Sequence, residues 1–294
     1  MKSTEFFNII APIAPIAYSK EFCSRYGAYD NSGLLIDCGN EVRAAVFALD
    51  LSAAAVEKAA KIGAGAIVTH HPAIYSKLSS LSCGDETGGA VLAAARAGIS
   101  VISMHLNLDA AEDGIDECLA RAVRLAARDA LGEPGCEAAT AAGDTAGDTA
   151  GAAEEKMLNF ACGSGGYGRV YDLAGGKEVS AAALKLSLDR VISGKHTLLY
   201  ASAYKKVKRA ASFCGAGADE EAVAFAVKNG ADALISSDFK HHILKEAVSR
   251  GMAVIAPTHY ASESYGFEKF YLKVKKIVGT AGVVCEYFEN SALL

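Results

Sequence analysis

The stretch Ala66-Ile67-Val68-Thr69-His70-His71-Pro72 is the one from which the rest of this chain can be interpreted. Its first residues are apolar and mostly branched at Cβ, which is typical of a buried strand, and two histidines follow directly. Side chains on a continuing strand alternate between its faces, so both imidazoles can serve one site only if the strand stops there. Pro72 favours that stop. The alternative is one buried and one exposed histidine with no shared role.

A second apolar stretch, residues 99–103, is followed by His105-Leu106-Asn107-Leu108-Asp109. Asp109 can supply a hard anionic metal ligand, and its alternative role is to cap the next helix. His105 can lie behind the ligands, where it orients one of them or moves a proton, and we therefore assign it a catalytic role.

A third apolar stretch, residues 252–256, precedes His259 and Glu263. These side chains are four residues apart and share one face if a helix begins at His259. Glu263 can then bridge two metal ions with its two oxygens while His259 holds one of them. The alternative is an ordinary histidine at a helix start and a solvated glutamate.

Three such clusters in a chain with only seven histidines predict a pair of divalent metal ions. Imidazole and carboxylate ligands suit zinc, iron, manganese or nickel and do not choose among them. Two metals that activate a water molecule are the arrangement of many hydrolases.

The second half of the chain offers Ser237-Asp238-Phe239-Lys240-His241-His242 at the position that His70-His71 occupies in the first half. Asp238, His241 or His242 can be the group that transfers a proton to or from a substrate. The alternative is a capped helix start, with Asp238 as the cap.

Strands and helices alternate along the chain, and the order strand–helix–strand–helix–strand occurs twice. Val56, Gly63 and Ala66 each have an identical residue 167 positions later, and Gly98 and Val101 each have one 153 positions later. This repeat predicts an internally duplicated α/β protein, with two related α/β/α sandwich lobes and mainly parallel or mixed sheets. Ligands in such sheets collect beyond the carboxyl ends of the strands.

We expect a first lobe over residues 1–132, with residues 266–294 packing back on it, and a second lobe over 157–265. Residues 133–156 are rich in Ala, Gly, Thr and Asp and have no apolar periodicity. Such a composition favours a low-complexity linker without chemistry of its own.

The composition narrows the class of protein. About half of the residues are hydrophobic, and the net charge of −5 argues against a basic nucleic-acid-binding face. The eight cysteines are scattered without a C-x-x-C pair, as in proteins of a reducing compartment. Prolines interrupt the apolar stretch 6–17, and no stretch is long enough to cross a bilayer. We expect a cytoplasmic protein with neither a nucleic-acid nor a membrane partner.

Six motifs occur in a characteristic order. They are Asp-Asn-Ser-Gly-Leu from residue 30, Thr-His-His-Pro from 69, His-x-Asn-Leu-Asp-Ala-Ala from 105, Gly-Ser-Gly-Gly from 163, Ser-Asp-x-Lys-His-His from 237 and Thr-His-Tyr-x-Ser-Glu from 258. This set resembles the Nif-three-like dinuclear metal-centre family, whose members are often labelled GTP cyclohydrolase I type 2 homologues. The resemblance covers the chain except residues 133–156.

The resemblance implies a toroidal homohexamer of two-lobed subunits with two divalent metal ions in each. Carried over motif by motif, it implies that His70 and His259 hold one metal, that His71 and Asp109 hold the other, and that Glu263 bridges them. It also implies a metal-dependent hydrolase of the GTP cyclohydrolase I type 2 kind, acting on a small nucleotide or phosphoester. The alternative is a metal carrier or regulatory scaffold without turnover.

Overall fold

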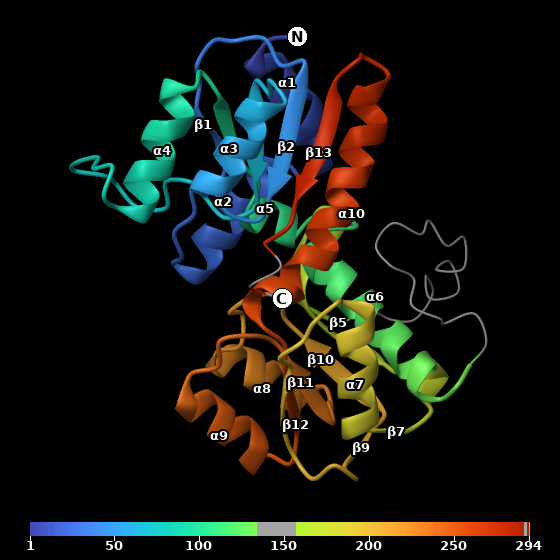
Figure 1. Cartoon of the computed structure of the whole chain (residues 1–294). Helices are drawn as coiled ribbons and strands as arrows, with labels where there is room; N and C mark the ends of the chain where they lie inside the picture. The colour runs from blue at the N-terminus through green and yellow to red at the C-terminus, as the bar shows by residue number, and fades with distance from the viewer. Residues whose placement is uncertain (134–156, 291–292, 294) are drawn as a thin grey trace. The chain divides into compact units, whose positions relative to one another are not determined.

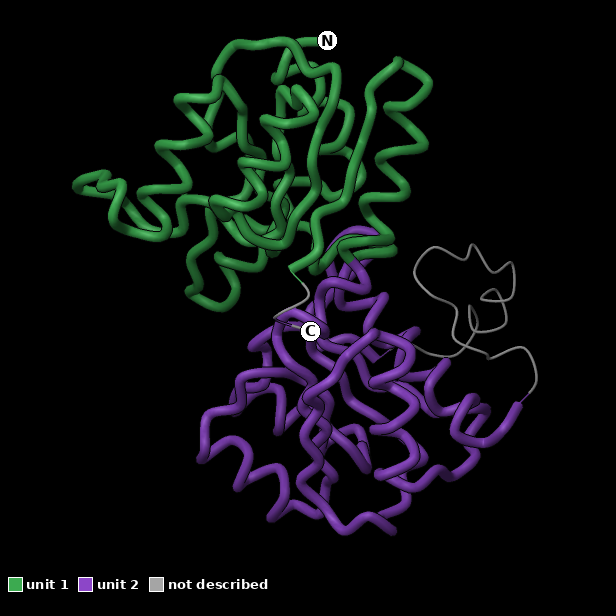
Figure 2. The backbone as a smooth tube through the Cα atoms, viewed as in Figure 1, with its two compact units in different colours: residues 1–114, 267–290 green, residues 115–266, 291–294 purple. Residues whose placement is uncertain are grey.

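The structure is a computed structural model that describes residues 1–133, 157–290 and 293. Within these residues the chain forms two compact α/β units (Figure 2). Unit 1 comprises Met1–Gly114 and Phe267–Asn290, and unit 2 comprises Ile115–Gly266. Apart from Glu133, the expected linker over residues 133–156 lies outside the described residues.

Unit 1 is built on a five-stranded sheet with the order β1-β4-β3-β2-β13 (Figure 1). Its strands are β1 (Gly33–Ile36), β2 (Ala44–Ala48), β3 (Ala66–Thr69), β4 (Ser100–Ser103) and β13 (Val284–Phe288). Only β1 runs antiparallel to its neighbour. Every residue of β2, β3 and β4 is buried, as expected for parallel strands whose two faces are covered by helices.

The helices of unit 1 follow from local sequence signals. They are α1 (Ser3–Ile10), α2 (Ile16–Tyr26), α3 (Ala53–Lys61), α4 (Glu86–Arg96), the short α5 (Leu106–Asp109) and the C-terminal part of α10 (His259–Gly279), together with the 3-10 turn η1 (Ala11–Ile13). Ser52 caps α3 by accepting a hydrogen bond from the backbone N–H of Ala55. Phe47 of β2 packs against the rings of Phe267 and Tyr271, which belong to α10.

Unit 2 is built on a six-stranded mixed sheet with the order β5-β6-β10-β11-β12-β8. Its strands are β5 (Met157–Cys162), β6 (Gly165–Asp172), β8 (Leu198–Tyr200), β10 (Arg209–Ser212), β11 (Ala233–Ile235) and β12 (Ala253–Ala256), and β7 (Val179–Ser180) pairs with β9 (Lys206–Val207) in a separate ribbon. The central strands β10, β11 and β12 are parallel, and β5 and β6 form an antiparallel hairpin. The glycine-rich stretch 163–168 therefore turns a hairpin and continues into β6.

The helices of unit 2 are α6 (Ile115–Ala130), α7 (Ala181–Val191), α8 (Glu220–Lys228), α9 (His241–Ser249) and the first residues of α10, with the 3-10 turn η3 (Ala174–Gly176). The sequence predicted that residues up to 132 belong to the first lobe, whereas α6 packs on α7 and β6 within unit 2. The physical reason is a buried ion pair, because Asp116 at the start of α6 lies 2.9 Å from the guanidinium of Arg169 on β6.

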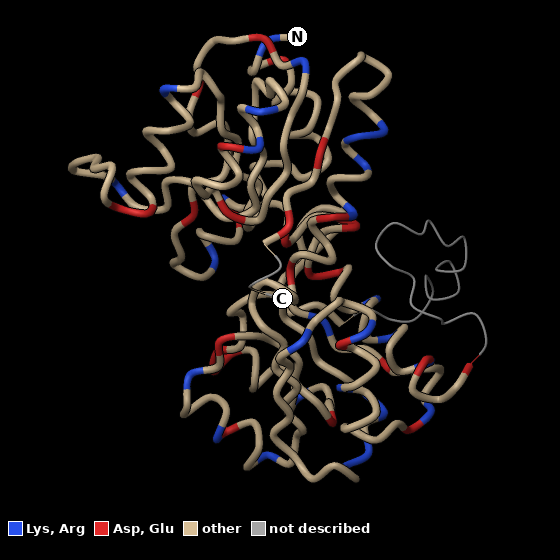
Figure 3. The backbone as a smooth tube through the Cα atoms, viewed as in Figure 1, with Lys and Arg blue, Asp and Glu red and all other residues tan. Residues whose placement is uncertain are grey.

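The duplicated fold predicted from the sequence is confirmed. The order β2-α3-β3-α4-β4 in unit 1 is repeated as β10-α8-β11-α9-β12 in unit 2, and in both the three strands are parallel. Basic and acidic residues are interspersed along both units (Figure 3). Within the described ranges, every helix is too short or too polar for a bilayer crossing.

Candidate metal site

The two histidines after β3 are held by the end of the neighbouring strand. The backbone N–H groups of His70 and His71 both donate to the carbonyl of Leu49, at 3.1 and 2.9 Å. The chain thus leaves the regular strand ladder at this point, as the sequence predicted. Both imidazoles can therefore lie on one side, and their ring centroids are 4.9 Å apart.

His70 is fully buried, and its ring orientation is set by a carbonyl. Its Nδ1 lies 2.8 Å from the carbonyl oxygen of Met104, which can only accept, so Nδ1 carries the proton. The neutral ring then has its lone pair on Nε2, which lies 3.5 Å from Oδ1 of the buried Asp109. A lone pair facing a carboxylate oxygen at this distance suits a cation that both atoms bind.

Carboxylates orient the other two imidazoles of unit 1. Nδ1 of His71 donates to Oδ1 of Asp50 at 2.7 Å, and Nδ1 of His105 donates to Oδ1 of Asp30 at 2.7 Å. Such pairs fix the tautomer and leave Nε2 to bind a metal. One nitrogen from each of His70, His71 and His105 lies within 4.8 Å of the other two. Unit 1 alone therefore gathers three imidazoles in a spacing that suits a metal ion.

Asp30 is strongly held in its ionised form. Burial opposes ionisation, but hydrogen bonds from His105, Ser19 and Ser32 outweigh it and lower the pKa of Asp30 from 3.8 to about 2. The hydroxyl groups of Ser19 and Ser32 lie 2.5 and 2.6 Å from Oδ2. The remaining oxygen, Oδ1, stays an acceptor for the imidazole of His105.

Unit 2 carries a similar arrangement at the start of α10. His259 is the first residue of this helix, which is the condition under which it shares a face with Glu263, and its Nδ1 donates to Oδ2 of Asp238 at 2.6 Å. Its Nε2 lies 3.1 Å from Oε1 of Glu263, which is 3% exposed. A Cβ added at Gly215, whose φ is +57°, would lie 2.3 Å from the same oxygen. Only glycine leaves room for this carboxylate.

The remaining predicted residues of unit 2 lie on its surface. His241 is the first residue of α9 and is exposed, and His242 is an exposed partner of Glu220, with 3.1 Å between Nε2 and Oε1. Of the three candidates for proton transfer in this stretch, the structure pairs only Asp238 with another predicted site residue, His259.

Two carboxylates of the site were missed by reasoning from the sequence. Asp50 lies two residues after the end of β2, and Asp30 lies three residues before the start of β1. The sequence offered only the signal that each carboxylate lies near the end of a strand. The pairs themselves join His71 to Asp50, 21 positions apart, and His105 to Asp30, 75 positions apart.

Comparison with known proteins identifies the family to which this chain belongs. The model of the Duf34/NIF3 (NGG1p interacting factor 3) family matches residues 1–290. Relatives include the GTP cyclohydrolase 1 type 2 homolog of Clostridium perfringens, which is 26% identical over 94% of this chain and 92% of its own length. The GTP cyclohydrolase 1 type 2 of Helicobacter pylori is 28% identical over 90% of this chain and 89% of its own.

Solved structures agree in fold. A Bacillus cereus protein related to NIF3 superposes with a TM-score of 0.75 and 17% identity, covering 98% of this chain and 97% of that one. Reduced HcgD from Methanocaldococcus jannaschii superposes with a TM-score of 0.69 and 20% identity, covering 98% of both chains. The family match over nearly the whole length, with the motifs and strand-end histidines described above, shows that the chain belongs to the Duf34/NIF3 family.

Proposed function

We propose that this protein is a dinuclear metalloenzyme that hydrolyses a nucleotide or a phosphoester. One observation carries the proposal: in unit 1 the Nδ1 atoms of His70, His71 and His105 are each held by a fixed acceptor. Metal-binding imidazoles commonly have such partners on one ring nitrogen, and one nitrogen of each of these three rings lies within 4.8 Å of the other two.

The proposed ligand set is the one that the family motifs imply. In it His70 and His259 would hold one divalent ion, His71 and Asp109 would hold the other, and Glu263 would bind both. Support comes from the pairs within each unit, since the atoms of His70 and Asp109 are 3.5 Å apart and those of His259 and Glu263 are 3.1 Å apart. Zinc, iron, manganese and nickel all fit these ligands.

Two bound ions would supply a water molecule of lowered pKa and polarise the substrate. The chain's own residues supply the orientation and the proton transfer. Asp50 and Asp238 hold the imidazoles of His71 and His259 in place. The Nδ1–H group of His105 donates a hydrogen bond to Asp30. Nε2 of His105 is therefore the atom that can accept or return a proton.

The substrate class and assembly are proposed from the family. The name of the Helicobacter pylori relative supports guanosine triphosphate as the first nucleotide to examine. We further propose a homohexamer in the cytoplasm. No disulfide joins the seven cysteines within the described residues, which fits a reducing compartment.

The test begins with elemental analysis of protein purified without a histidine tag. Two metal ions per chain are expected, followed by turnover of a nucleotide or phosphoester once that metal is restored. Glu263→Gln should lose both metal and turnover, because the amide cannot bridge two cations. The matched control is Glu246→Gln on α9, where a partly exposed glutamate pairs with Arg250. A fully metallated and active Glu263→Gln protein would contradict the proposal.

Metal exchange separates the enzyme from the alternative of a metal carrier. A catalytic pair should survive dialysis and support turnover. A carrier should pass its metal readily to a competing chelator and show no turnover with any nucleotide or phosphoester in the screen.

A further inference from the structure

Two tyrosines of unit 1 lie side by side, and each is about half exposed. Tyr29 lies in the segment before β1 and Tyr75 in the loop after β3, and they are 51% and 52% exposed. Their rings are nearly perpendicular, with 5.6 Å between the ring centroids and 86° between the planes. The pair therefore presents two aromatic surfaces to solvent, at a right angle to each other.

Hydrogen bonds hold the two rings in place. The Tyr75 hydroxyl donates to the backbone carbonyl of Tyr29 at 3.1 Å, and Nδ2 of Asn31 donates to the carbonyl of Ile74 at 2.6 Å. The loop after β3 is thus joined twice to the segment before β1. Side chains that are already fixed lose little conformational entropy when a ligand contacts them, so such rings are well suited to binding.

The aromatic pair lies beside the imidazoles of the candidate metal site. The ring of Tyr75 is 6.4 Å from the ring of His105, at an angle of 89°. The His105 ring is in turn 5.2 Å from that of His70 and 5.8 Å from that of His71. His71 and His105 are both partly exposed. A group that reaches His105 from solvent therefore lies within reach of Tyr75.

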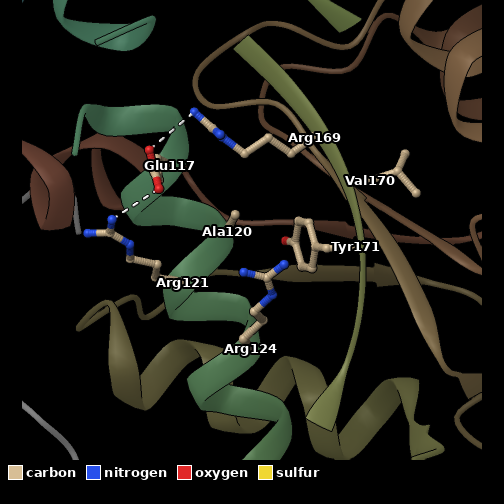
Figure 4. A pocket seen from close by; sticks show the side chains of 7 residues that line it. All are labelled: Glu117, Ala120, Arg121, Arg124, Arg169, Val170 and Tyr171. Carbon is tan, nitrogen blue, oxygen red and sulfur yellow. Dashed lines mark hydrogen bonds and ion pairs between the residues drawn. The ribbon is translucent and has the colours of Figure 1, made fainter. Parts of the chain in front are cut away.

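Tyr171 of unit 2 illustrates the opposite case, a tyrosine whose ring already has a partner. It is buried, and the guanidinium carbon of Arg124 lies 4.7 Å from its ring centre (Figure 4). Tyr29 and Tyr75 instead leave half of their surface to solvent next to three oriented imidazoles. Aromatic side chains in such places are typical of the walls of small-molecule sites.

Given the proposed hydrolysis of a nucleotide or phosphoester, on which this inference rests, we propose that Tyr29 and Tyr75 bind the base of a nucleotide. One ring stacks on a face of the base and the other contacts its edge, which is the arrangement that perpendicular rings allow. Stacking accepts any base, because every base has a π face. The aromatic pair thus selects ligands that carry a planar ring, and it holds that ring next to His105.

The test measures binding and does not depend on turnover. Guanosine is titrated into the full chain as purified, and again after removal of metal ions with a chelator, while its base protons are followed by NMR. We expect saturable upfield shifts of these protons in both states, because the ring currents of tyrosine shield a stacked base and stacking needs no metal ion. Ribose 5-phosphate, which has no base, is the control ligand.

Substitutions locate the stacking surface. Tyr29→Leu and Tyr75→Leu should each weaken guanosine binding about fivefold or more, because the base loses an aromatic ring to stack on. Tyr75→Phe keeps the ring and should bind guanosine like the parent, which separates stacking from the hydrogen bond to Tyr29. Tyr204→Leu removes a ring that is 86% exposed in unit 2 and should also bind like the parent. No variant should change the response to ribose 5-phosphate.

Three results would overturn the proposal. The first is guanosine that shows no saturable upfield shift with the parent protein. The second is unchanged guanosine affinity in both Tyr29→Leu and Tyr75→Leu. The third is an equal loss of affinity in Tyr204→Leu, which would place the base in unit 2.

The outcome is separable from that of the proposed function. A protein that stacks guanosine but holds no metal and turns nothing over contradicts only the proposed function. A metal-loaded protein that hydrolyses a phosphoester but does not stack guanosine contradicts only the role of Tyr29 and Tyr75.

Discussion

At the scale of single residues, the candidate site depends on carboxylates that hold imidazoles. Asp50 accepts the Nδ1 proton of His71 from a position at the end of the adjacent strand, and its side chain is 47% exposed. Its removal should therefore disturb the orientation of His71 without disturbing the core.

Asp50→Ala should lower metal affinity about 10- to 100-fold while the fold is kept, because the imidazole loses the acceptor that sets its tautomer. Competition with a chelator of known affinity measures the change, and circular dichroism checks the fold. Glu57→Ala is the control, since Glu57 forms an exposed ion pair with Lys61 on α3 of the same unit. Equal affinities in Asp50→Ala and the parent would refute a role for this carboxylate.

Gly215 tests the packing of Glu263 against the backbone. Gly215→Ala adds a Cβ at 2.3 Å from Oε1 of Glu263 and forces a left-handed φ of +57° on alanine. Gly251→Ala carries a similar strain, with φ +84°, but has open space around the added atom. The strained φ should cost each variant about 1 kcal/mol of stability, the clash should make the loss larger in Gly215→Ala, and only Gly215→Ala should also lose bound metal. Urea denaturation measures the stability of the two variants, and elemental analysis measures their metal content. Equal metal contents in Gly215→Ala and Gly251→Ala would rule out this packing constraint.

Much of the site at this scale could be predicted from local pattern. His70, His71 and His259 follow apolar stretches that form buried strands, and the spacing of His259 and Glu263 places them on one face once α10 begins at His259. Asp50 and Asp30 could not be assigned to their imidazoles, because such pairs depend on which strands become neighbours. No local periodicity encodes that choice.

At the scale of elements, α6 is fixed to unit 2 by its first turn. Asp116 is fully buried and accepts hydrogen bonds from Arg169 Nε and from the backbone N–H groups of Gly168 and Cys214 at 2.9, 3.1 and 3.2 Å. The helix therefore links the β5–β6 hairpin to the loop that follows β10. An amphipathic helix has the same sequence pattern whichever sheet it covers, which is why the boundary at Gly114 could not be read from residues 115–130.

Asp116→Asn should destabilise the protein by about 3–5 kcal/mol, because it leaves the buried guanidinium of Arg169 without its nearest counter-charge. Urea unfolding followed by circular dichroism gives the loss. Asp129→Asn, at the other end of α6, removes an ion pair with the 58%-exposed Arg190 and should cost no more than about 1 kcal/mol. Similar losses in the two variants would show that burial does not set the strength of the Asp116 pair.

At the scale of the whole molecule, the first unit is assembled from both ends of the described chain. β13 joins the edge of the unit 1 sheet beside β2, in parallel register from Val284 opposite Ala44 to Phe288 opposite Ala48. A chain that stops at Gly279 would leave the fully buried strand β2 at an open edge.

Truncation after Gly279 should therefore unfold unit 1 and leave the core of unit 2 folded, because each unit has its own sheet and core. Hydrogen exchange is the measurement: amides of β2, β3 and β4 should lose protection, and those of β10, β11 and β12 should keep it. A milder change is the substitution Val284→Pro, which removes one backbone N–H donor at the first residue of β13. It should lower the stability of unit 1 less than the truncation does. Retained protection in β2 after truncation would contradict this account.

The late arrival of β13 also has a consequence for synthesis on the ribosome. The strands that flank His70 emerge early, but their outermost neighbour is translated only after the whole of unit 2. At translation rates of about 5–20 residues per second, the edge strand β2 waits roughly ten to fifty seconds for its partner. During that interval the nascent chains on one polysome expose the same unpaired edge of β2 close to one another. We expect a chaperone that binds nascent chains to act at this stage.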